Sequence, residues 1–378
     1  MIFSIIIFII TLLVLVLIHE LGHFLVAKKF NIKVLEFGFG IPPRAWGKKF
    51  GETIFSLNWL PFGGFVKLLG EDEVDRKILE NHRSFAAQEV FRRILVVVAG
   101  VLMNLLFAWV LFYAVLASQG FKFQIDLRFD HKFFLTDQQV ETVVLVGSVA
   151  KDSPAESAGI KMGDRIIAIN GEEISGEGEL VNKTKSLAGQ EIKITLSDPQ
   201  KQNLKDVTVT PRINPPEGQG PLGISFGQFR VATLEYRSLL SKLLLGPIHS
   251  WNLIAYSGKV FGQLINQSIL EKSFTPVSHS VAGPVGITNL ANSILTSTDK
   301  PFIPYINFVA ILSLNLAVIN LLPIPALDGG RLFFLLVEAL TRRRVHAEIE
   351  RWVHAVGLAL LLALTIFITF SDIQKILF

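Results

Sequence analysis

Long apolar runs dominate the pattern of hydrophobic and polar positions along this chain. A helix needs about 20 apolar residues to cross the hydrocarbon core of a bilayer. Four runs reach this length range: Ile2–Ala27, Ile94–Ala117, Phe302–Leu322 and Val353–Phe370. Half of the 378 residues are hydrophobic and only 18% are charged. We therefore predict a polytopic α-helical membrane protein with four transmembrane helices, whose first partner is the lipid bilayer.

A further apolar stretch, Ser238–Leu270, is interrupted by polar residues and helix breakers. The interruptions are Lys242, Gly246, Pro247 and Lys259. This pattern is typical of amphipathic helices that lie on a membrane surface, and we predict one or two of them here. A fifth membrane span is the alternative.

Between the first two runs, the segment Gly51–Asp72 alternates apolar and polar residues around Pro61, Gly63 and Gly64. Such alternation around a Pro/Gly cluster predicts a β-hairpin, here close to the membrane face. An extended substrate segment could pair with the edge of this hairpin. An ordinary interfacial hairpin without a binding role is the alternative.

These patterns divide the chain into seven segments. In order, we expect a first span over 1–27, a hairpin region over 28–93, a second span over 94–117, a soluble segment over 118–235, membrane-associated helices over 236–300, a third span with its following loop over 301–331, and a turn with the fourth span over 332–378.

Charge placement predicts the orientation of the spans. Basic residues cluster after the first span, before the second span and between the third and fourth spans. Because cytoplasmic loops carry the excess of Lys and Arg, the first and third loops are expected in the cytoplasm. Both termini and the soluble segment then face the other side. The net charge of +4 is small, and we expect no nucleic-acid partner.

The sequence contains no cysteine, so His, Asp and Glu are the candidate metal ligands. The stretch "HELGH" near the end of the first run places His19 and His23 four residues apart, on one face of a helix. Glu20 lies beside them. H-E-x-x-H on a helix is typical of zinc proteases, with two His ligands and a glutamate base.

Polar residues that merely link neighbouring helices are the alternative for these three residues. An unpaired carboxylate in a bilayer costs about 2.5 to 3.5 kcal/mol even on the lenient insertion scale. A bound cation would offset that cost, so burial of Glu20 in an apolar run favours the metal site.

A catalytic zinc needs a third protein ligand. Asp328 in "NLLPIPALDGGRL" is the candidate, because it follows the third span at the depth expected for His19 and His23. A turn aspartate in a Pro/Gly loop is the alternative. The other six histidines flank spans or lie in the outer segment, and we expect no ligand among them: His82, His131, His249, His279, His346 and His354.

Together, "HELGH" and "NLLPIPALDGG" resemble the site-2 protease family of intramembrane zinc metalloproteases, in the branch of the bacterial regulator-of-sigma-E protease. Other pieces fall in family order over nearly the whole chain: "FGFGIPPR", "PFGGFVKLLGED", "AGVLMN" and "GPVGI". One departure is Val101, which stands where the family usually has proline. This leaves the local helix shape around Asn104 open.

The resemblance implies site residues and a cofactor. His19, His23 and Asp328 would bind Zn²⁺, and Glu20 would be the catalytic base. Asn320 would hold the substrate backbone or the oxyanion. The further candidates for substrate binding are Pro323, Pro325, Gly63, Gly64 and Asn104.

Within the soluble segment, "GSVAKDSPAESAGIKMGDRIIAING" resembles a PDZ domain, with Ala158, Gly159, Gly163 and Asp164 at the family's positions. We expect an inserted, extracytoplasmic PDZ-like domain of mixed β and α structure over about 141–213. Another small β-rich domain is the alternative. PDZ folds bind extended peptides or C-termini at a sheet edge, and "GPLGISF" resembles the element at that edge.

The resemblance implies zinc-dependent peptide hydrolysis within a bacterial inner membrane. Its substrates would be single-span proteins already trimmed on the outer side, such as anti-sigma factors or remnant signal peptides. Two other classes stay open. A zinc enzyme that is not a protease would leave the PDZ-like domain unexplained, and a non-catalytic scaffold would have no use for Glu20.

Overall fold

The computed structural model describes residues 2–71, 78, 80–197, 204–297 and 301–377. Small parts of the predicted segments, residues 1, 72–77, 79, 198–203, 298–300 and 378, lie outside the described part. The chain forms two compact units, which are taken separately below. The first consists of Met1–Ala117 and Leu245–Phe378, and the second of Ser118–Leu244.

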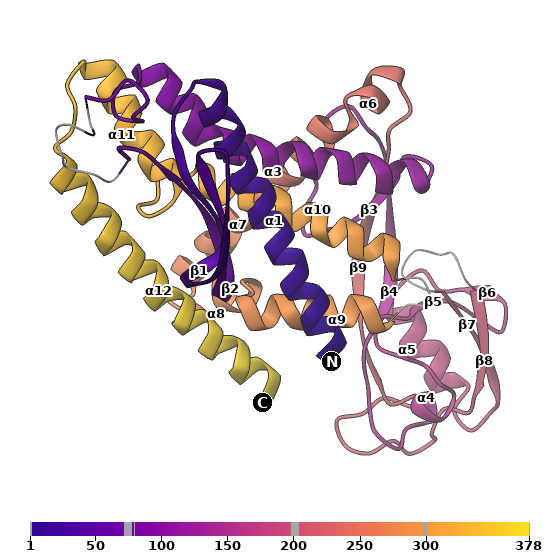
Figure 1. Cartoon of the computed structure of the whole chain (residues 1–378). Helices are drawn as coiled ribbons and strands as arrows, with labels where there is room; N and C mark the ends of the chain where they lie inside the picture. The colour runs from indigo at the N-terminus through magenta and orange to yellow at the C-terminus, as the bar shows by residue number, and fades with distance from the viewer. Residues whose placement is uncertain (1, 72–77, 79, 198–203, 298–300, 378) are drawn as a thin grey trace. The chain divides into compact units, whose positions relative to one another are not determined.

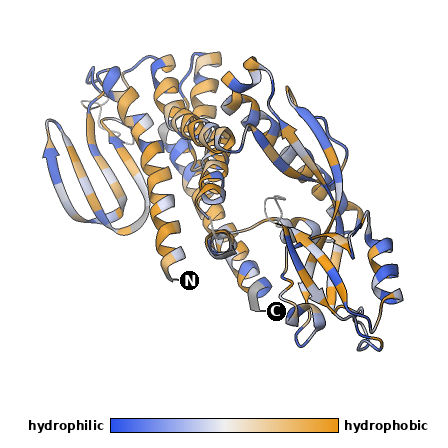
Figure 2. Cartoon of the chain, turned by 90° about the vertical axis from the view of Figure 1, so that its right-hand side faces the viewer, coloured by the Kyte–Doolittle hydropathy of each residue, from blue (hydrophilic) through white to orange (hydrophobic). Residues whose placement is uncertain are grey.

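Four helices of the first unit are long and apolar enough to cross a membrane. Among the described residues these are α1 (Ile2–Lys29), α3 (Val90–Ser118), α10 (Phe302–Leu321) and α12 (Ala347–Leu377). Hydrophobic residues run along these helices in Figure 2, and many large apolar side chains on them are exposed. The four candidate spans predicted from the sequence are thus confirmed by length and composition.

Further helices complete the first unit. They are α7 (Leu245–Leu270), α8 (Thr275–Ser280), α9 (Pro284–Ser297) and α11 (Asp328–Thr341). By hydropathy α7 does not join the four candidate spans. Where we expected only a turn after the third span, the chain forms α11, a helix that begins at Asp328 itself (Figure 1).

The helix α12 contacts the rest of this unit at few points, and one of them is at its last turns. The Asp372 carboxylate, which is buried, accepts a hydrogen bond of 2.7 Å from the backbone N–H of Gly286, in the first turn of α9. An acceptor at a helix N-terminus satisfies one of its unpaired N–H groups. The "GPVGI" segment therefore serves as a docking point for α12.

The region between α1 and α3 contains two long strands, β1 (Val34–Phe50) and β2 (Thr53–Leu68). They are joined by a tight turn at Gly51 and Glu52, which the sequence pattern did not predict. The chain also reverses at the predicted Pro61–Gly64 cluster, inside β2, because Ile54–Leu57 run parallel to Glu36–Phe39 whereas Gly64–Lys67 run antiparallel to them. The first part of β1 lies between two parts of β2, because Glu36–Phe39 pair with Ile54–Leu57 and also with Gly64–Lys67.

Charged groups anchor the hairpin turn. The Glu52 carboxylate accepts hydrogen bonds of 2.6 Å from Arg83 and from Lys28, the latter at the end of α1. These hydrogen bonds, Arg83 first and Lys28 second, lower the pKa of Glu52 to about 2. The turn is thereby tied to the end of the first helix.

The second unit is rich in β-sheet. Its strands are β3 (Lys122–Leu127), β4 (Asp137–Val149), β5 (Arg165–Ile169), β6 (Glu172–Glu173), β7 (Ile192–Ser197), β8 (Leu204–Val209) and β9 (Ile224–Glu235). The sheet order is β3-β9-β4-β5-β7-β8, with β6 paired to β5. Three helices accompany the sheet: α4 (Pro154–Ser157), α5 (Glu177–Ser186) and α6 (Leu239–Leu243). Ile166, Leu180 and Ile194 lie in its apolar core.

Candidate metal centre

The two histidines of "HELGH" lie on one face of α1, as their spacing predicts. Their ring centroids are 4.8 Å apart, and the two Nε2 atoms are separated by 3.2 Å. His19 is buried at 8% exposure and the His23 side chain at 13%. Two imidazole nitrogens this close need either a shared proton or a cation between them.

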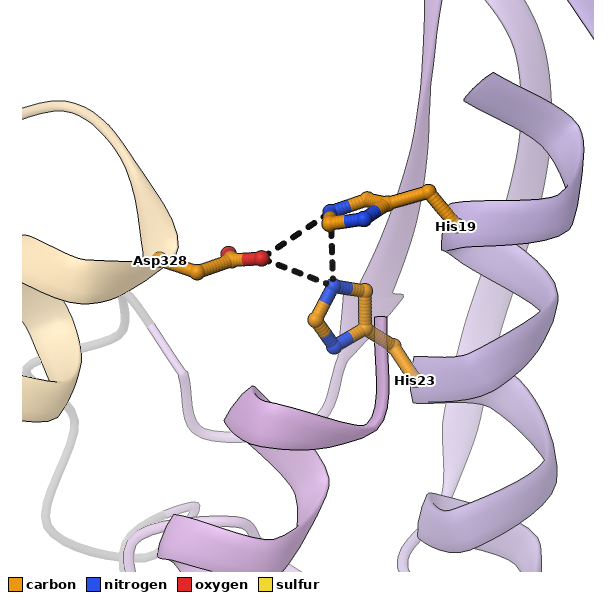
Figure 3. A group of neighbouring side chains, drawn as sticks. All are labelled: His19, His23 and Asp328. Carbon is orange, nitrogen blue, oxygen red and sulfur yellow. Dashed lines mark hydrogen bonds and ion pairs between the residues drawn. The ribbon is translucent and has the colours of Figure 1, made fainter. Parts of the chain in front are cut away.

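The structure brings Asp328 to these histidines from a distant part of the sequence. After α10 ends at Leu321, the Pro-rich loop turns the chain, and Asp328 opens α11. Its Oδ2 atom lies 2.9 Å from His19 Nε2 and 3.3 Å from His23 Nε2 (Figure 3). A buried ion pair also links α11 to α3, with Arg93 Nη2 2.5 Å from Glu338 Oε1. This pair helps to keep the helix that carries Asp328 in place.

The spacing of these three donor atoms fits a zinc ion. Zinc–ligand bonds of about 2.0–2.2 Å in tetrahedral geometry place neighbouring donors about 3.3–3.6 Å apart, and separations of about 3 Å need only a small outward shift. The three separations here are 2.9, 3.2 and 3.3 Å. Asp328 Oδ2 is buried and makes no hydrogen bond of regular geometry among the described residues, although it faces both imidazoles. Two imidazoles and a carboxylate are also the ligand types that zinc prefers.

Neighbouring groups orient both imidazoles. His23 Nδ1 lies 2.8 Å from the carbonyl oxygen of Val96 on α3. If Nδ1 donates to this carbonyl, the lone pair of Nε2 points toward the site, as in most histidine–metal contacts. The other face of the pair is covered by Asn104, which is fully buried and whose amide lies 3.5 Å from His19 Nδ1.

The amide of Asn104 can orient His19 in the same way. Its Oδ1 has no hydrogen-bond partner in the described part of the chain. Amide oxygen and nitrogen are assigned from their surroundings, so a rotated amide would accept from His19 Nδ1–H. The backbone carbonyl of Asn104 also accepts a 2.7 Å hydrogen bond from the Ser313 hydroxyl on α10. Asn104 thus lies behind the imidazole. Despite Val101, α3 stays helical through this region.

Close approach of α3 to the histidines requires Gly100. A Cβ at this position would overlap His23 Nε2 and would lie 2.8 Å from His19 Cε1. The imidazoles therefore rest directly on the α3 backbone, where small residues allow helices to pack closely. The "AG" pair at Ala99 and Gly100 is part of the site, a role for Gly100 that the sequence pattern did not reveal.

Glu20 opens into a cavity of about 620 Å³ beside the three donor atoms. The hairpin reaches this cavity at Gly64, where a Cβ would lie 3.2 Å from Glu20 Cγ. An ion pair between Arg331 and Glu71 lies at the same cavity. The residues that line it are Glu20, His23, Gly64–Leu68, Glu71, Phe85, Val96, Val97, Ala326–Asp328, Arg331, His354, Ala355 and Leu358.

The other predicted substrate-binding residues are distributed differently. Gly63 precedes Gly64 and has a φ of +82°, which favours glycine. Pro325 lines a separate apolar pocket against α12. Asn320 and Pro323 are not among the described residues that line the Glu20 cavity.

His354 was not expected at the site, yet it lines the same cavity. The sequence offered only a span-flanking histidine, because the contact depends on how α12 packs. Gly100 and Arg331 were missed because their contacts likewise depend on packing between segments far apart in the sequence.

Comparison with known proteins agrees with this geometry. The model of peptidase family M50 matches residues 7–364. A Clostridium acetobutylicum relative, classed as a zinc metalloprotease by name, is 32% identical over 371 aligned residues, covering 98% of this chain and 97% of the relative. The zinc metalloprotease RasP of Geobacillus kaustophilus is 30% identical and covers 98% of each chain. The regulator of sigma-W protease RasP of Bacillus subtilis is 26% identical and covers 99% of each. The chain therefore belongs to peptidase family M50, the site-2 proteases, which are zinc metalloproteases acting within membranes.

Proposed function

We propose that His19, His23 and Asp328 bind the zinc ion of this protease and that Glu20 is its general base. The observation that carries the proposal is the convergence of three donor atoms, 2.9 to 3.3 Å apart, beside a carboxylate that opens into a cavity. A zinc ion held there would supply Lewis-acid chemistry, polarising the scissile carbonyl and acidifying water.

The protein's own residues then move the protons. Glu20 takes one proton from the attacking water, whose oxygen bonds to the scissile carbonyl carbon. When the C–N bond breaks, Glu20 returns the proton to the leaving nitrogen, so that a carboxyl group and an amine result. Gly64 lets β2 pack directly against Glu20, because a Cβ there would lie 3.2 Å from both Glu20 Cγ and Val16 Cγ1. Asn104, buried behind His19, acts in this proposal by orienting the ligand.

The proposed substrate binds as an extended strand along Gly64–Leu68. These residues line the cavity and pair on one side with the first part of β1. Backbone groups on the other edge can take up an added strand. The carbonyls of a helical substrate are already hydrogen-bonded and shielded, so scission needs such an unwound segment. The cavity also carries Arg331 and Glu71, one charge of each sign, close to the strand.

The proposed substrates are pre-trimmed, single-span membrane proteins, either anti-sigma factors or remnant signal peptides. The name of the Bacillus subtilis relative, a regulator of sigma-W, supports the first class. We place the protein in a bacterial inner membrane as a multi-pass protein, with the hairpin and α11 in the cytoplasm. Both termini and the second unit would lie outside. The basic residues near the ends of the candidate spans support this orientation.

We further propose that residues 141–213 form a PDZ-like domain that selects substrates. Several contacts support a filter rather than peptide capture. Among the described residues, β3 pairs with Arg230–Glu235 of β9 and does not cover the first part of β9. The helix α5 contacts β9 as well. There Glu177 Oε1 accepts a 2.6 Å hydrogen bond from the Gln228 N–H, a group that an added peptide strand would need.

The test of the zinc centre compares Glu20→Gln with Asp328→Ala. Glu20→Gln should keep bound zinc and should lower cleavage of a single-span model peptide by at least about 10²–10⁴-fold, the usual contribution of a general base. Asp328→Ala should lose zinc as well as activity. Metal content and cleavage are measured on the same purified samples. Near wild-type cleavage by Glu20→Gln, or full zinc in Asp328→Ala, would show that the assignment is wrong.

The test of the filter removes residues 147–211 and compares full-length with pre-trimmed forms of one substrate. A filter predicts that trimmed substrate is still cut and that full-length substrate becomes a substrate. Zinc content of the deletion variant serves as the control for its first unit. The filter idea fails if full-length substrate stays uncut while cleavage of the trimmed form falls sharply.

A further inference from the structure

An imidazole of α12 is hydrogen-bonded to the loop that carries Asp328. His354 Nδ1 accepts a 2.8 Å hydrogen bond from the backbone N–H of Ala326, two residues before Asp328. The ring lies 5.8 Å from that of Phe334 on α11, and its side chain is 18% exposed. It faces the cavity that also holds Glu20. This histidine has no part in the chemistry described above.

Ala326 has a backbone conformation that must be stabilised by contacts from outside its loop. Its φ is +74°, in the left-handed region, which residues with a Cβ rarely adopt. Non-glycine residues persist there when their surroundings over-determine them, and such residues cluster at functional sites. Inside the loop, Ile324 N–H bonds to Leu322 O and Leu327 N–H bonds to Ile324 O. The N–H of Ala326 is instead bound by α12.

A second contact from the same face of α12 holds the preceding residue. Gly357 is buried, and a Cβ there would overlap Pro325 Cβ. His354 and Gly357 lie three positions apart, on neighbouring sites of one helical face. The loop is therefore gripped at Pro325 by packing and at Ala326 by a hydrogen bond. Only the hydrogen bond is directional, so it determines how the peptide that leads to Asp328 is turned.

We propose that His354 is a positioning residue of the metal centre. It keeps the Ala326 peptide in its left-handed conformation, and this conformation places the Asp328 carboxylate against His19 and His23. The inference rests on the proposed role of Asp328 as a ligand. It assigns to α12, which supplies none of the three donor atoms, a part in holding zinc.

The experiment measures zinc affinity in the detergent-solubilised full chain by competition with a chromophoric chelator. Three substitutions are compared. His354→Leu removes the acceptor, His354→Asn keeps an acceptor near the position of Nδ1, and His354→Gln moves it toward that of Nε2. Thr365→Val is the matched control, because that exposed hydroxyl donates a hydrogen bond of 2.8 Å to Leu361 O within its own helix.

His354→Leu is expected to weaken zinc binding by about 10- to 100-fold, the range for residues that orient metal ligands. His354→Asn should bind zinc much more tightly than His354→Gln, and Thr365→Val should match the wild type. Wild-type affinity in His354→Leu would overturn the proposal. If His354→Leu does not fold, the Asn and Gln variants decide. Equal zinc affinity in these two, whether high or low, would also overturn it, because a merely structural role does not depend on where the acceptor lies.

Asp328→Ala in the same series separates this inference from the proposed function. If Asp328→Ala keeps its zinc, the proposed ligand set is wrong. If Asp328→Ala loses zinc while His354→Leu keeps it, the ligand set stands and the positioning role of His354 fails.

Discussion

The two sides of the metal centre are built in different ways. On one side, α1 and α3 pack so closely that the imidazoles of His19 and His23 rest on the backbone at Gly100. On the other side, Asp328 begins a helix after an irregular loop. That loop packs against α12, which is largely exposed. The first side is fixed by direct packing of α3 against α1, the helix that carries both imidazoles. The second depends on a few contacts from a helix that carries none.

This difference teaches where the centre should tolerate change. Protein interiors are close-packed, so an added side chain between α1 and α3 has no room to be absorbed. A helix such as α12, with few neighbours, can shift and relieve an overlap at lower cost. The same substitution, a glycine replaced by valine, should therefore lower zinc affinity by different amounts on the two sides.

The largest effect is expected from Gly100→Val. The new side chain would overlap the His23 ring. Zinc affinity should therefore fall by ~100-fold or more, the upper end of the range for residues that orient metal ligands. Metal content and chelator competition measure it. Leu102→Val, at an exposed site on the same helix, is the control and should keep wild-type zinc. Full zinc occupancy in Gly100→Val would mean that α1 and α3 are not as tightly coupled as described.

A smaller effect is expected from Gly357→Val on the opposite side. Its Cβ would overlap Pro325, but α12 can move outward. We expect zinc affinity and peptide cleavage to fall by about 10-fold, the low end of the range for supporting residues. Ile366→Ala, at an exposed site of α12, should be silent. A loss as large as that of Gly100→Val would break the comparison, since both sides would then be equally rigid.

The smallest effect is expected at the hairpin turn, which is held by charge rather than by packing. The pKa of Glu52 is lowered to about 2, so its contribution to stability is present above the ordinary carboxyl pKa and is lost as the pH falls toward about 2. Exposed ion pairs contribute about 0.2–1 kcal/mol each. Glu52→Gln should therefore lower the Tm slightly at pH 7, and the difference should shrink between about pH 4.5 and pH 2. A difference that grows on acidification would contradict the assigned ion pairs.

Local patterns were enough to predict much of this architecture. The apolar runs predicted all four candidate spans, because hydropathy over about 20 residues is a local property. The spacing of His19 and His23 predicted that they share a helical face, and the structure places their rings together. Asp328 was predicted as the third ligand because it follows the third span in a Pro/Gly loop at the expected depth of His19 and His23. In the structure its carboxylate lies beside both rings.

Contacts between segments far apart in the sequence could not be predicted from such local patterns. The reversal near Pro61, Gly63 and Gly64 was predicted from the sequence, but the second turn at Gly51 and Glu52 was not. The register there follows from pairing across both parts of β2, and from the ion pairs of Glu52 with Lys28 and Arg83. Likewise, nothing near His354 in the sequence indicates that it contacts Ala326.

The late position of Asp328 in the sequence has a consequence for biosynthesis. His19 and His23 leave the ribosome long before Asp328 does, and His354 follows Asp328. With the ligand set proposed above, a nascent chain that has inserted α1 and α3 holds only two donors. It gains the third when α11 forms, and the hydrogen bond to Ala326 only when α12 has entered the membrane. With this ligand set, a protease assembled in this order would stay inactive toward neighbouring nascent membrane proteins until α11 and α12 have been synthesised.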